Sequence, residues 1–344
     1  MDLSRLLLSA LALPLALTLT ACAGRHSPLE DLSKVQLEAM LDGGQVQPTA
    51  QWQETWQILS LKLQNDGLDA QKTRALFSGL TTQPSRTPMQ AKVKELYTSK
   101  WIPVPPAKST ADKPSSTKAT KSPAMELGVP DPWFKGVVTE ANALRCRDFI
   151  RTHDRAFYEA QRRYGVPQEV GAALLFVETR LGTYLGKNDA FHMLAGMAVT
   201  RMPELIPETV AALPDAHIRL PWIREKMQVK ADWAYDELKA LLTHCFANGL
   251  DPLSLKGSIY GAVGLCQFMP SNLPRYAADG DGDGVIDVFV PADAIASLSR
   301  YLMEHGWKPG LPLDRQAKVL RSYNNMTIYA NTILALAETI RRLP

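Results

Sequence analysis

An uncharged apolar helix in the middle of the chain constrains the fold more than any other feature. It lies within PQEVGAALLFVETR, residues 167–180, and Pro167 stands where proline favours a first helical turn. A helix that is apolar on every face has to be buried, so a helical core is expected around it. Glu178 ends the apolar stretch, where partial desolvation raises the pKa of a carboxyl group. Glu178 is therefore either a general acid, which must hold a proton near neutral pH, or a surface carboxylate paired with Arg180 or Lys187.

Composition and charge exclude several classes of protein. The chain has 344 residues, enough for roughly two domains. Its 46% hydrophobic and 21% charged residues exclude a disordered chain, a collagen and a multi-span membrane protein. A net charge of +3 gives no concentrated basic face, so no nucleic-acid partner is expected. The four cysteines are too few for a disulfide scaffold and lack zinc spacing; they are Cys22, Cys146, Cys245 and Cys266.

The N-terminus is expected to be a lipoprotein signal. An apolar stretch at 6–19 follows Arg5 and ends in LTAC at Cys22, which resembles a bacterial lipobox. Cys22 would then be acylated, and several lipid chains on it would form a stable membrane anchor. Ala23, rather than Asp, follows the cysteine, which resembles lipoproteins sorted to the outer membrane. The expected location is the periplasm, anchored in the inner leaflet of the outer membrane; a plain secretory signal that contains a cysteine is the alternative.

Helical patterns dominate the remainder of the chain. Apolar residues recur at helical spacing across 51–63, and the Asn-Asp-Gly at 65–67 is expected to end that helix. Further helices are expected at 68–79 and from about 88 to 97. The expected organisation has five parts: a lipoprotein signal peptide at 1–21, a tether at 22–47, a small helical N-terminal segment at 48–102, a linker rich in Pro, Ser, Thr and Lys at 103–125, and an α-rich main domain at 126–344.

A glycine-rich stretch at 258–271, SIYGAVGLCQFMPS, carries a second candidate site. Gly261 and Gly264 permit close approach to the backbone. Gln267 stands in otherwise apolar surroundings, and a buried glutamine needs partners at both ends of its amide. A sugar N-acetyl or hydroxyl group would supply them. The alternative is a glutamine that bonds only to nearby backbone.

An aspartate-rich loop at 276–295 follows the spacing of an EF-hand. The expected ligands, at its first, third, fifth, seventh and ninth places, are Asp279, Asp281, Asp283, the Val285 carbonyl and Asp287. The twelfth place, normally a bidentate acid, is Val290, and Asp293 is expected to cap the next helix. Two interpretations are open: a structural calcium loop, or an acidic turn without stoichiometric metal.

An aromatic and amide cluster begins the last helical stretch: Tyr323-Asn324-Asn325, with Tyr329 following. Such a cluster suits sugar stacking and hydrogen bonding, but it also suits helix capping and core packing.

Taken in order, these blocks carry a resemblance. They are YGVPQEVGAALLFVETRLGTYLGK (164–187), DPLSLKGSIYGAVGLCQFMPSN (251–272), YAADGDGDG (276–284) and SYNNMTIYA (322–330). Together they resemble the membrane-bound lytic murein transglycosylase B family. The resemblance implies a mainly α, lysozyme-like catalytic domain in which Glu178 is the single catalytic acid/base. It further implies that the substrate is bound by Ser258, Gln267, Phe268 and Tyr323, that no cofactor is required, and that the aspartate loop binds calcium in some members.

The activity implied by this resemblance is cleavage of peptidoglycan glycan strands. The β-1,4 bond between N-acetylmuramic acid (MurNAc) and N-acetylglucosamine (GlcNAc) would break without water and leave a 1,6-anhydromuramoyl end. Two departures are visible: Cys266 replaces the family's usual glycine, and Val290 replaces an acidic ligand. A hydrolytic muramidase on the same fold and a catalytically silent wall-binding lipoprotein are the alternatives.

Overall fold

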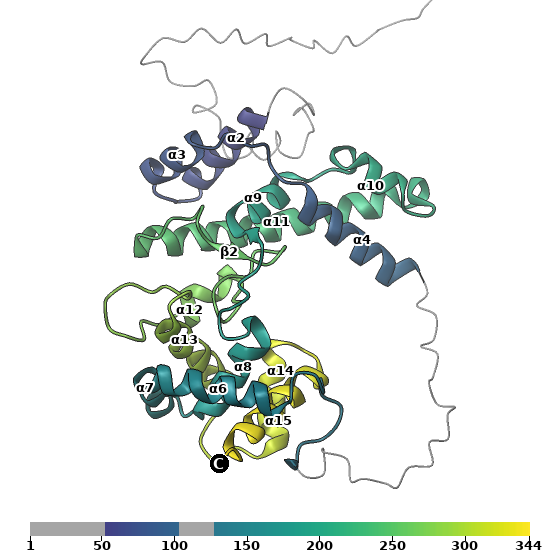
Figure 1. Ribbon diagram of the computed structural model, residues 1–344. Helices are drawn as coiled ribbons and strands as arrows, with labels where there is room; N and C mark the ends of the chain where they lie inside the picture. The colour runs from purple at the N-terminus through teal and green to yellow at the C-terminus, as the bar shows by residue number, and fades with distance from the viewer. Residues whose placement is uncertain (1–51, 103–126) are drawn as a thin grey trace, which may run out of the picture.

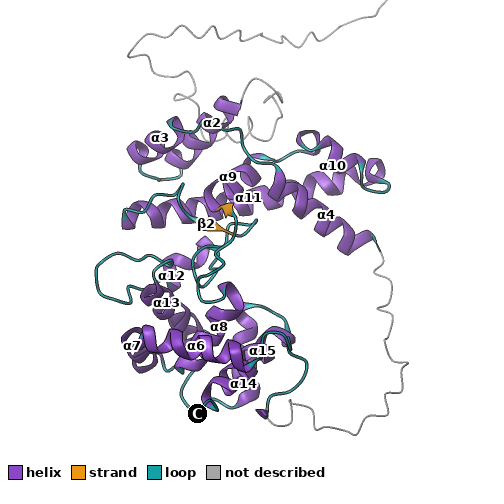
Figure 2. Cartoon of the chain, in the orientation of Figure 1, coloured by secondary structure: helices purple, strands orange, loops and turns teal. Residues whose placement is uncertain are grey.

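The computed structural model describes residues 52–102 and 127–344, which are mainly helical (Figures 1 and 2). The expected mainly α class is therefore confirmed. The expected signal peptide, the lipidation site at Cys22, the tether and the linker lie outside the described residues. Within the described ranges, no helix is long and apolar enough to span a membrane.

One group of helices joins the N-terminal helices to the middle of the chain. Its members are α2 (Trp52–Asn65), α3 (Ala70–Ser78), α4 (Thr87–Trp101), α9 (Ala190–Val199), the short η1 (Pro203–Leu205), α10 (Pro207–Ala211) and α11 (Ala216–Asn248). In this group α11 runs along α9, and α4 packs against both. The expected end of the first helix is confirmed, because α2 ends at Asn65 and Gly67 follows with a left-handed φ of +97°.

A second group of helices surrounds the apolar helix, α8. Its members are α6 (Glu140–Thr152), α7 (Asp154–Tyr164), α8 (Gln168–Thr179), α12 (Leu273–Tyr276), α13 (Pro291–Glu304), α14 (Leu313–Tyr323) and α15 (Thr327–Arg341). Every α8 residue at 170–176 is buried, and α8 contacts α6, α7, α13 and α15. The expectation that an all-apolar helix lies at the centre of the core is confirmed. Figure 1 shows this group at the opposite end of the molecule from α2 and α3.

Short extended segments lie between the two groups. Strand β1 (Asn188–Asp189) pairs antiparallel with β2 (Lys256–Gly257), with Asn188 opposite Gly257. From β2 the chain continues into residues 258–271, whose last two residues begin the short η2 (Pro270–Asn272), and η2 packs against α11. A Cβ on Gly186, where φ is +96°, would lie 2.1 Å from the Gly257 carbonyl oxygen. Only glycine at 186 permits this close approach.

The N-terminal helices are fastened to α11 and its neighbours by side-chain hydrogen bonds. Lys72 Nζ donates to the Phe246 carbonyl at 2.8 Å, and Tyr235 Oη donates to Asp66 Oδ2 at 2.6 Å. Arg86 Nη1 donates to the Leu205 carbonyl at 2.7 Å. Residues 52–101 therefore pack on the following helices. The domain boundaries expected from the sequence remain predictions.

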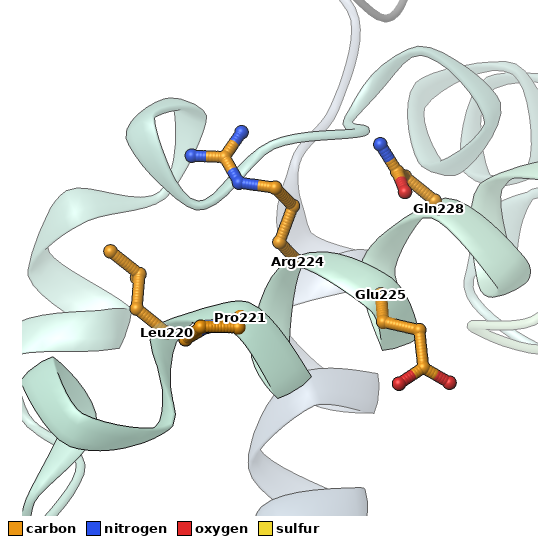
Figure 3. Close-up of a pocket in the computed structure, with 5 residues that line it drawn as sticks. All are labelled: Leu220, Pro221, Arg224, Glu225 and Gln228. Carbon is orange, nitrogen blue, oxygen red and sulfur yellow. The ribbon is translucent and has the colours of Figure 1, made fainter.

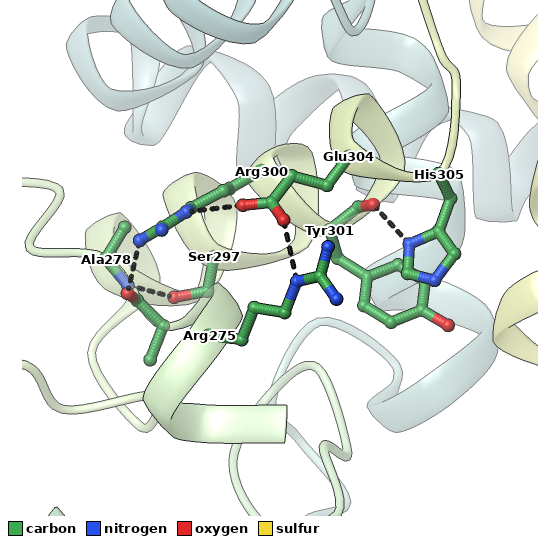
Figure 4. A network of polar contacts seen from close by, with 8 residues as sticks. Arg275, Ala278, Ser297, Arg300, Tyr301, Glu304 and His305 are labelled. Atoms are coloured by element: carbon green, nitrogen blue, oxygen red, sulfur yellow. Dashed lines mark hydrogen bonds and ion pairs between the residues drawn. The ribbon is translucent and has the colours of Figure 1, made fainter. Parts of the chain in front are cut away.

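A polar network joins α12 to α13 (Figure 4). Arg275 Nε and Arg300 Nε donate to the two oxygens of Glu304, at 2.9 and 3.1 Å, so both guanidinium groups flank one carboxylate. Ser297 Oγ accepts from the backbone N–H of Ala278 at 2.9 Å. These contacts hold α13 beside residues 273–278. The cysteines in the described residues, Cys146, Cys245 and Cys266, are all free and buried.

Candidate active site

Glu178 lies two residues before α8 gives way to an unusual turn. Arg180 and Leu181 both have left-handed φ angles, of 51° and 61°, which cost energy for residues other than glycine. The buried Thr179 stabilises this turn. Its hydroxyl donates to the Leu265 carbonyl at 2.9 Å and accepts from the Gly182 N–H at 3.0 Å. The helix end that carries Glu178 is therefore attached to the 258–271 segment.

The Glu178 side chain is partly exposed, but its carboxyl is largely desolvated and has one polar partner. Burial raises its pKa to about 7, and a hydrogen bond from Tyr329 Oη to Glu178 Oε1 opposes that rise. The expected rise in pKa is confirmed. In the described residues, neither Arg180 nor Lys187 forms an ion pair with Glu178 or contributes to its pKa, so the surface ion-pair interpretation is not supported. Burial also raises the pKa of Tyr329 far above its usual range, so Tyr329 remains a neutral donor.

Gln267 lies in a tight turn between two paired backbone residues, Val263 and Phe268. Val263 and Phe268 exchange both backbone hydrogen bonds, at 2.8 and 3.0 Å, and Val263 also bridges to Gly257. Gln267 itself has a left-handed φ of 48°. Its Nε2 donates to the Gly264 carbonyl at 3.0 Å, as the backbone interpretation expected, whereas Oε1 accepts from no described residue. One end of the amide is therefore fixed while its oxygen stays available.

Ser258 follows Gly257, which pairs with Val263 on the side away from Phe268. Its Oγ accepts from the backbone N–H groups of Tyr260 and Ala262, at 3.2 and 3.0 Å. A hydroxyl has two acceptor positions and one proton. Because both acceptor positions are used, the hydroxyl proton of Ser258 is left to donate.

Phe268 and Tyr323 pack against each other beside the paired segments at 263–268. Phe268 is 1% exposed, and its ring centroid lies 5.7 to 6.4 Å from those of Tyr276, Tyr301 and Tyr323. The expectation that Phe268 contacts substrate is therefore replaced by a packing role, because its side chain is buried in this aromatic cluster. Tyr323 Oη donates to the Cys266 carbonyl, which fixes the backbone just before Gln267.

Tyr329, which the sequence does not single out as a site residue, contacts Glu178, whereas the expected Tyr323 does not. Both belong to the aromatic cluster that the sequence marks, but only Tyr329 contacts Glu178. Tyr329, Ile333 and Leu336 recur at i, i+4 and i+7 on the buried face of α15. This periodicity predicts that Tyr329 lies on a buried face, and the packing of α15 on α8 then places it next to the apolar helix.

The aspartate loop differs from the EF-hand pattern. One oxygen from each of Asp279, Asp281 and Asp293 lies within 4.8 Å of the others. The carboxylates of Asp283 and Asp287 stay outside this cluster and accept instead from the N–H groups two residues on, at 2.8 and 2.9 Å. The clustered oxygens are the kind of ligand that calcium prefers.

The expected capping role of Asp293 is wrong. Val290 occupies the N-cap position of α13, and Asp293, which is 2% exposed, points back into the loop. Its oxygens accept from the N–H groups of Gly280 and Asp287, each at 2.7 Å. Asp293 thus supplies an acidic group that the loop lacks at Val290.

A separate cavity lies on α11, away from these residues. It has a volume of about 300 Å³ and is lined by Leu220, Pro221, Arg224, Glu225 and Gln228 (Figure 3). Arg224, at its edge, pairs with Glu204 at 2.5 Å. The cavity shares no residue with the Glu178 site and is therefore not part of it.

Known proteins are similar to this chain in sequence and in fold. A family profile described as a transglycosylase SLT domain matches residues 51–320. The chain belongs to this family. The membrane-bound lytic murein transglycosylase B of Escherichia coli K12 is 33% identical over 199 residues, which is 58% of this chain and 48% of that protein. The match therefore spans about half the length of this curated relative.

Solved structures show the same fold for this transglycosylase SLT domain. Escherichia coli Slt35 in complex with calcium aligns with a TM-score of 0.54 and 22% identity, over 83% of this chain and 92% of that one. Pseudomonas aeruginosa SltB3 in complex with NAG-anhNAM-pentapeptide aligns with a TM-score of 0.56 and 20% identity, over 85% and 79%. The expected lysozyme-like, mainly α fold is confirmed.

Proposed function

We propose that this protein is a peptidoglycan lytic transglycosylase that cleaves the MurNAc–GlcNAc bond and leaves a 1,6-anhydromuramoyl end. The observation that carries the proposal is the partly buried Glu178, whose pKa of about 7 suits both giving and taking a proton near neutral pH. Membership of the transglycosylase family supports it, as do the names of the murein-cleaving relative and of the SltB3 complex with an anhydro-sugar peptide.

In the first step, Glu178 acts as the acid. It gives its proton to the glycosidic oxygen, and the bond from that oxygen to C1 of the muramoyl residue breaks. The carbonyl oxygen of the neighbouring acetamido group attacks C1 and forms an oxazolinium-like intermediate. At neutral pH about half of the Glu178 carboxyls hold the required proton, given a pKa of about 7.

In the second step, Glu178 acts as the base. Its carboxylate removes the proton of the muramoyl 6-hydroxyl, whose oxygen then attacks C1 and opens the oxazolinium ring. The anhydro ring closes, Glu178 is protonated again, and no water is consumed. Tyr329 supports this step because its hydroxyl donates to the Glu178 carboxylate that exists between the two proton transfers.

Ser258 and Gln267 have complementary hydrogen-bonding capacity for an acetamido group. Ser258 retains a proton to donate to the acetamido carbonyl, and Gln267 Oε1 is available to accept from its N–H. Such positioning groups hold the reacting atoms in an attack geometry, which lowers the barrier.

A hydrolytic muramidase is the second candidate function. Ordinary glycosidases use two carboxyl groups about 5 to 10 Å apart. The proposed reaction needs Glu178 alone, whose pKa is set by burial and by the Tyr329 hydroxyl. Mass spectrometry of muropeptides released from purified sacculi separates the functions. Anhydro ends are expected, whereas reducing ends alone would establish hydrolysis, and no release would favour a silent wall-binding protein.

We further propose that the protein is lipid-anchored at Cys22 in the periplasm, on the inner leaflet of the outer membrane. The lipobox-like LTAC sequence supports this, as does the membrane-bound description of the Escherichia coli relative. Replacing Cys22 by alanine should abolish lipid labelling and release the protein into the soluble periplasmic fraction. If the Cys22→Ala variant stayed in the membrane fraction, the anchor would lie elsewhere.

A further inference from the structure

Three side chains form a closed set of contacts between α4 and the turn that carries Ser258. Tyr260 Oη donates to Glu95 Oε2 at 2.9 Å. Lys92 Nζ lies 3.9 Å from the centroid of the Tyr260 ring, a cation–π distance. The same ammonium donates to both oxygens of Glu95, at 2.9 and 2.8 Å. Each of the three groups therefore contacts the other two.

These contacts lie at the surface of the molecule. The Lys92 side chain is 15% exposed and that of Glu95 is 53% exposed, so the ammonium group is the more shielded partner. The hydrogen bond from Lys92 is the main cause that lowers the pKa of Glu95, so the carboxylate stays ionised. Burial and Glu95 raise the pKa of Tyr260 to about 12, so its hydroxyl keeps the donated proton throughout the neutral range.

The backbone of Tyr260 belongs to the Ser258 turn. Its N–H donates to Ser258 Oγ, and the N–H of Ala262 does the same. Between them, Gly261 has a φ of +84° and approaches α9 so closely that a Cβ would lie 2.4 Å from Leu194 Cγ. The turn is therefore tight, and a displacement of Tyr260 would move one of the two donors that orient the Ser258 hydroxyl.

We propose that Tyr260, held by Glu95 and Lys92, is a positioning residue that fixes the Ser258 turn for substrate. Helix α4, through Glu95, thereby influences the active site, although the acid Glu178 lies 83 residues further along the chain, on α8. The effect on turnover rests on the proposed function, whereas the effect on the turn does not.

The test compares Tyr260→Phe with Tyr158→Phe in the full-length protein. Both changes remove one hydroxyl, but Tyr158 is 63% exposed on α7 and serves as the matched control. We expect Tyr260→Phe to lower kcat/KM for anhydro-muropeptide release by about 3- to 10-fold, since small misplacements at a site cost rate. Melting temperature should change little, and amide exchange in the peptide that contains residues 258–262 should become faster.

Variants of the partner sharpen the test. Glu95→Ala should cause a similar loss, and Glu95→Gln should restore part of it because its amide oxygen still accepts from Tyr260. The double variant Tyr260→Phe/Glu95→Ala should be no worse than Glu95→Ala alone. The proposal would be overturned if the loss in the double variant equalled the product of the two single losses in kcat/KM. It would also be overturned if Tyr260→Phe matched the Tyr158→Phe control in kcat/KM.

Amide exchange separates this proposal from the proposed function. If the wild type released no anhydro-muropeptides, the proposed function would fail, and faster exchange in Tyr260→Phe would still support the anchoring of the turn. Unchanged exchange at 258–262 would overturn the anchoring whatever the activity.

Discussion

The carboxyl of Glu178 and that of Asp279, in the aspartate loop, have different surroundings, and their pKa values shift in opposite directions. Glu178 is partly buried at the end of an apolar helix with one hydroxyl donor, and desolvation raises its pKa to about 7. Asp279 accepts from the backbone N–H groups of Gly284 and Gly282, which lower its pKa below the usual range. The first carboxyl can exchange a proton near neutral pH, whereas the second is a permanent anion. The surroundings, more than the residue type, determine the chemistry of each carboxyl.

Asp293 combines features of both sites. It is 2% exposed, and burial is the main cause that raises its pKa, although it belongs to the aspartate loop. The nearby charges of Asp281 and Asp279 raise it further. A cation among these three oxygens would offset their mutual repulsion, which favours calcium binding at the loop. Glu178 is a single carboxyl group and has no such repulsion to offset.

The largest expected effect is the loss of activity in Glu178→Gln. The amide keeps the volume of the side chain but cannot give and then take a proton, and acid/base assistance is worth about 10²- to 10⁴-fold in rate. The measurement is anhydro-muropeptide release from sacculi, with circular dichroism as the check on folding. Activity within about threefold of wild type would exclude Glu178 as the acid/base and remove the contrast between the two carboxyl sites.

The same variant is expected to be more stable than wild type above pH 7. Below pH 4.5 the Glu178 carboxyl is neutral in both the folded and the unfolded chain, so the two proteins should melt alike. As pH rises from 4.5 to 7, the unfolded carboxyl ionises first and the wild type loses relative stability. The difference should level off above pH 7 at about 3 kcal/mol. Thermal unfolding of both proteins from pH 4 to 8 measures it, and a difference independent of pH would mean that burial does not raise this pKa.

Tyr329→Phe should produce a smaller shift within the same site. The hydroxyl of Tyr329 stabilises the carboxylate, so its removal should raise the pKa of Glu178 further. The limb of the pH–rate profile at which Glu178 loses its proton should therefore move to higher pH. Tyr323→Phe is the control because its hydroxyl bonds to the Cys266 carbonyl instead. Equal profiles for the two variants would contradict the assignment of Tyr329 as the partner of Glu178.

The sequence predicts the apolar helix and the raised pKa of Glu178 because both depend on local composition. It predicts the N-terminal helices for the same reason. It cannot choose between Tyr323 and Tyr329 without the packing of α15 on α8, a contact between segments about 150 residues apart. Phe268 illustrates the same limit, since only the aromatic cluster shows its ring to be buried. Asp293 was misplaced because the EF-hand pattern counts along the chain, whereas the fold brings α13 back over the loop.

The smallest expected effect concerns calcium in the aspartate loop, where the sequence pattern and the structure name different ligands. Affinity follows the number of charged ligands and the rigidity of the loop, and extracellular sites reach only about 10⁻⁴ to 10⁻³ M. Calcium at ten times its dissociation constant would add about 1.4 kcal/mol of stability, which is a few degrees in melting temperature. The increment should vanish in Asp281→Ala, a member of the three-carboxylate cluster, and persist in Asp283→Ala, which the EF-hand spacing includes but the cluster does not.

Scanning calorimetry with and without chelator measures this stability increment for each variant. Equal loss in both variants would favour the EF-hand ligand set, and a wild type without any response to millimolar calcium would make the loop an acidic turn. Loss of activity on chelation with the fold intact would instead give the metal a direct part in the reaction.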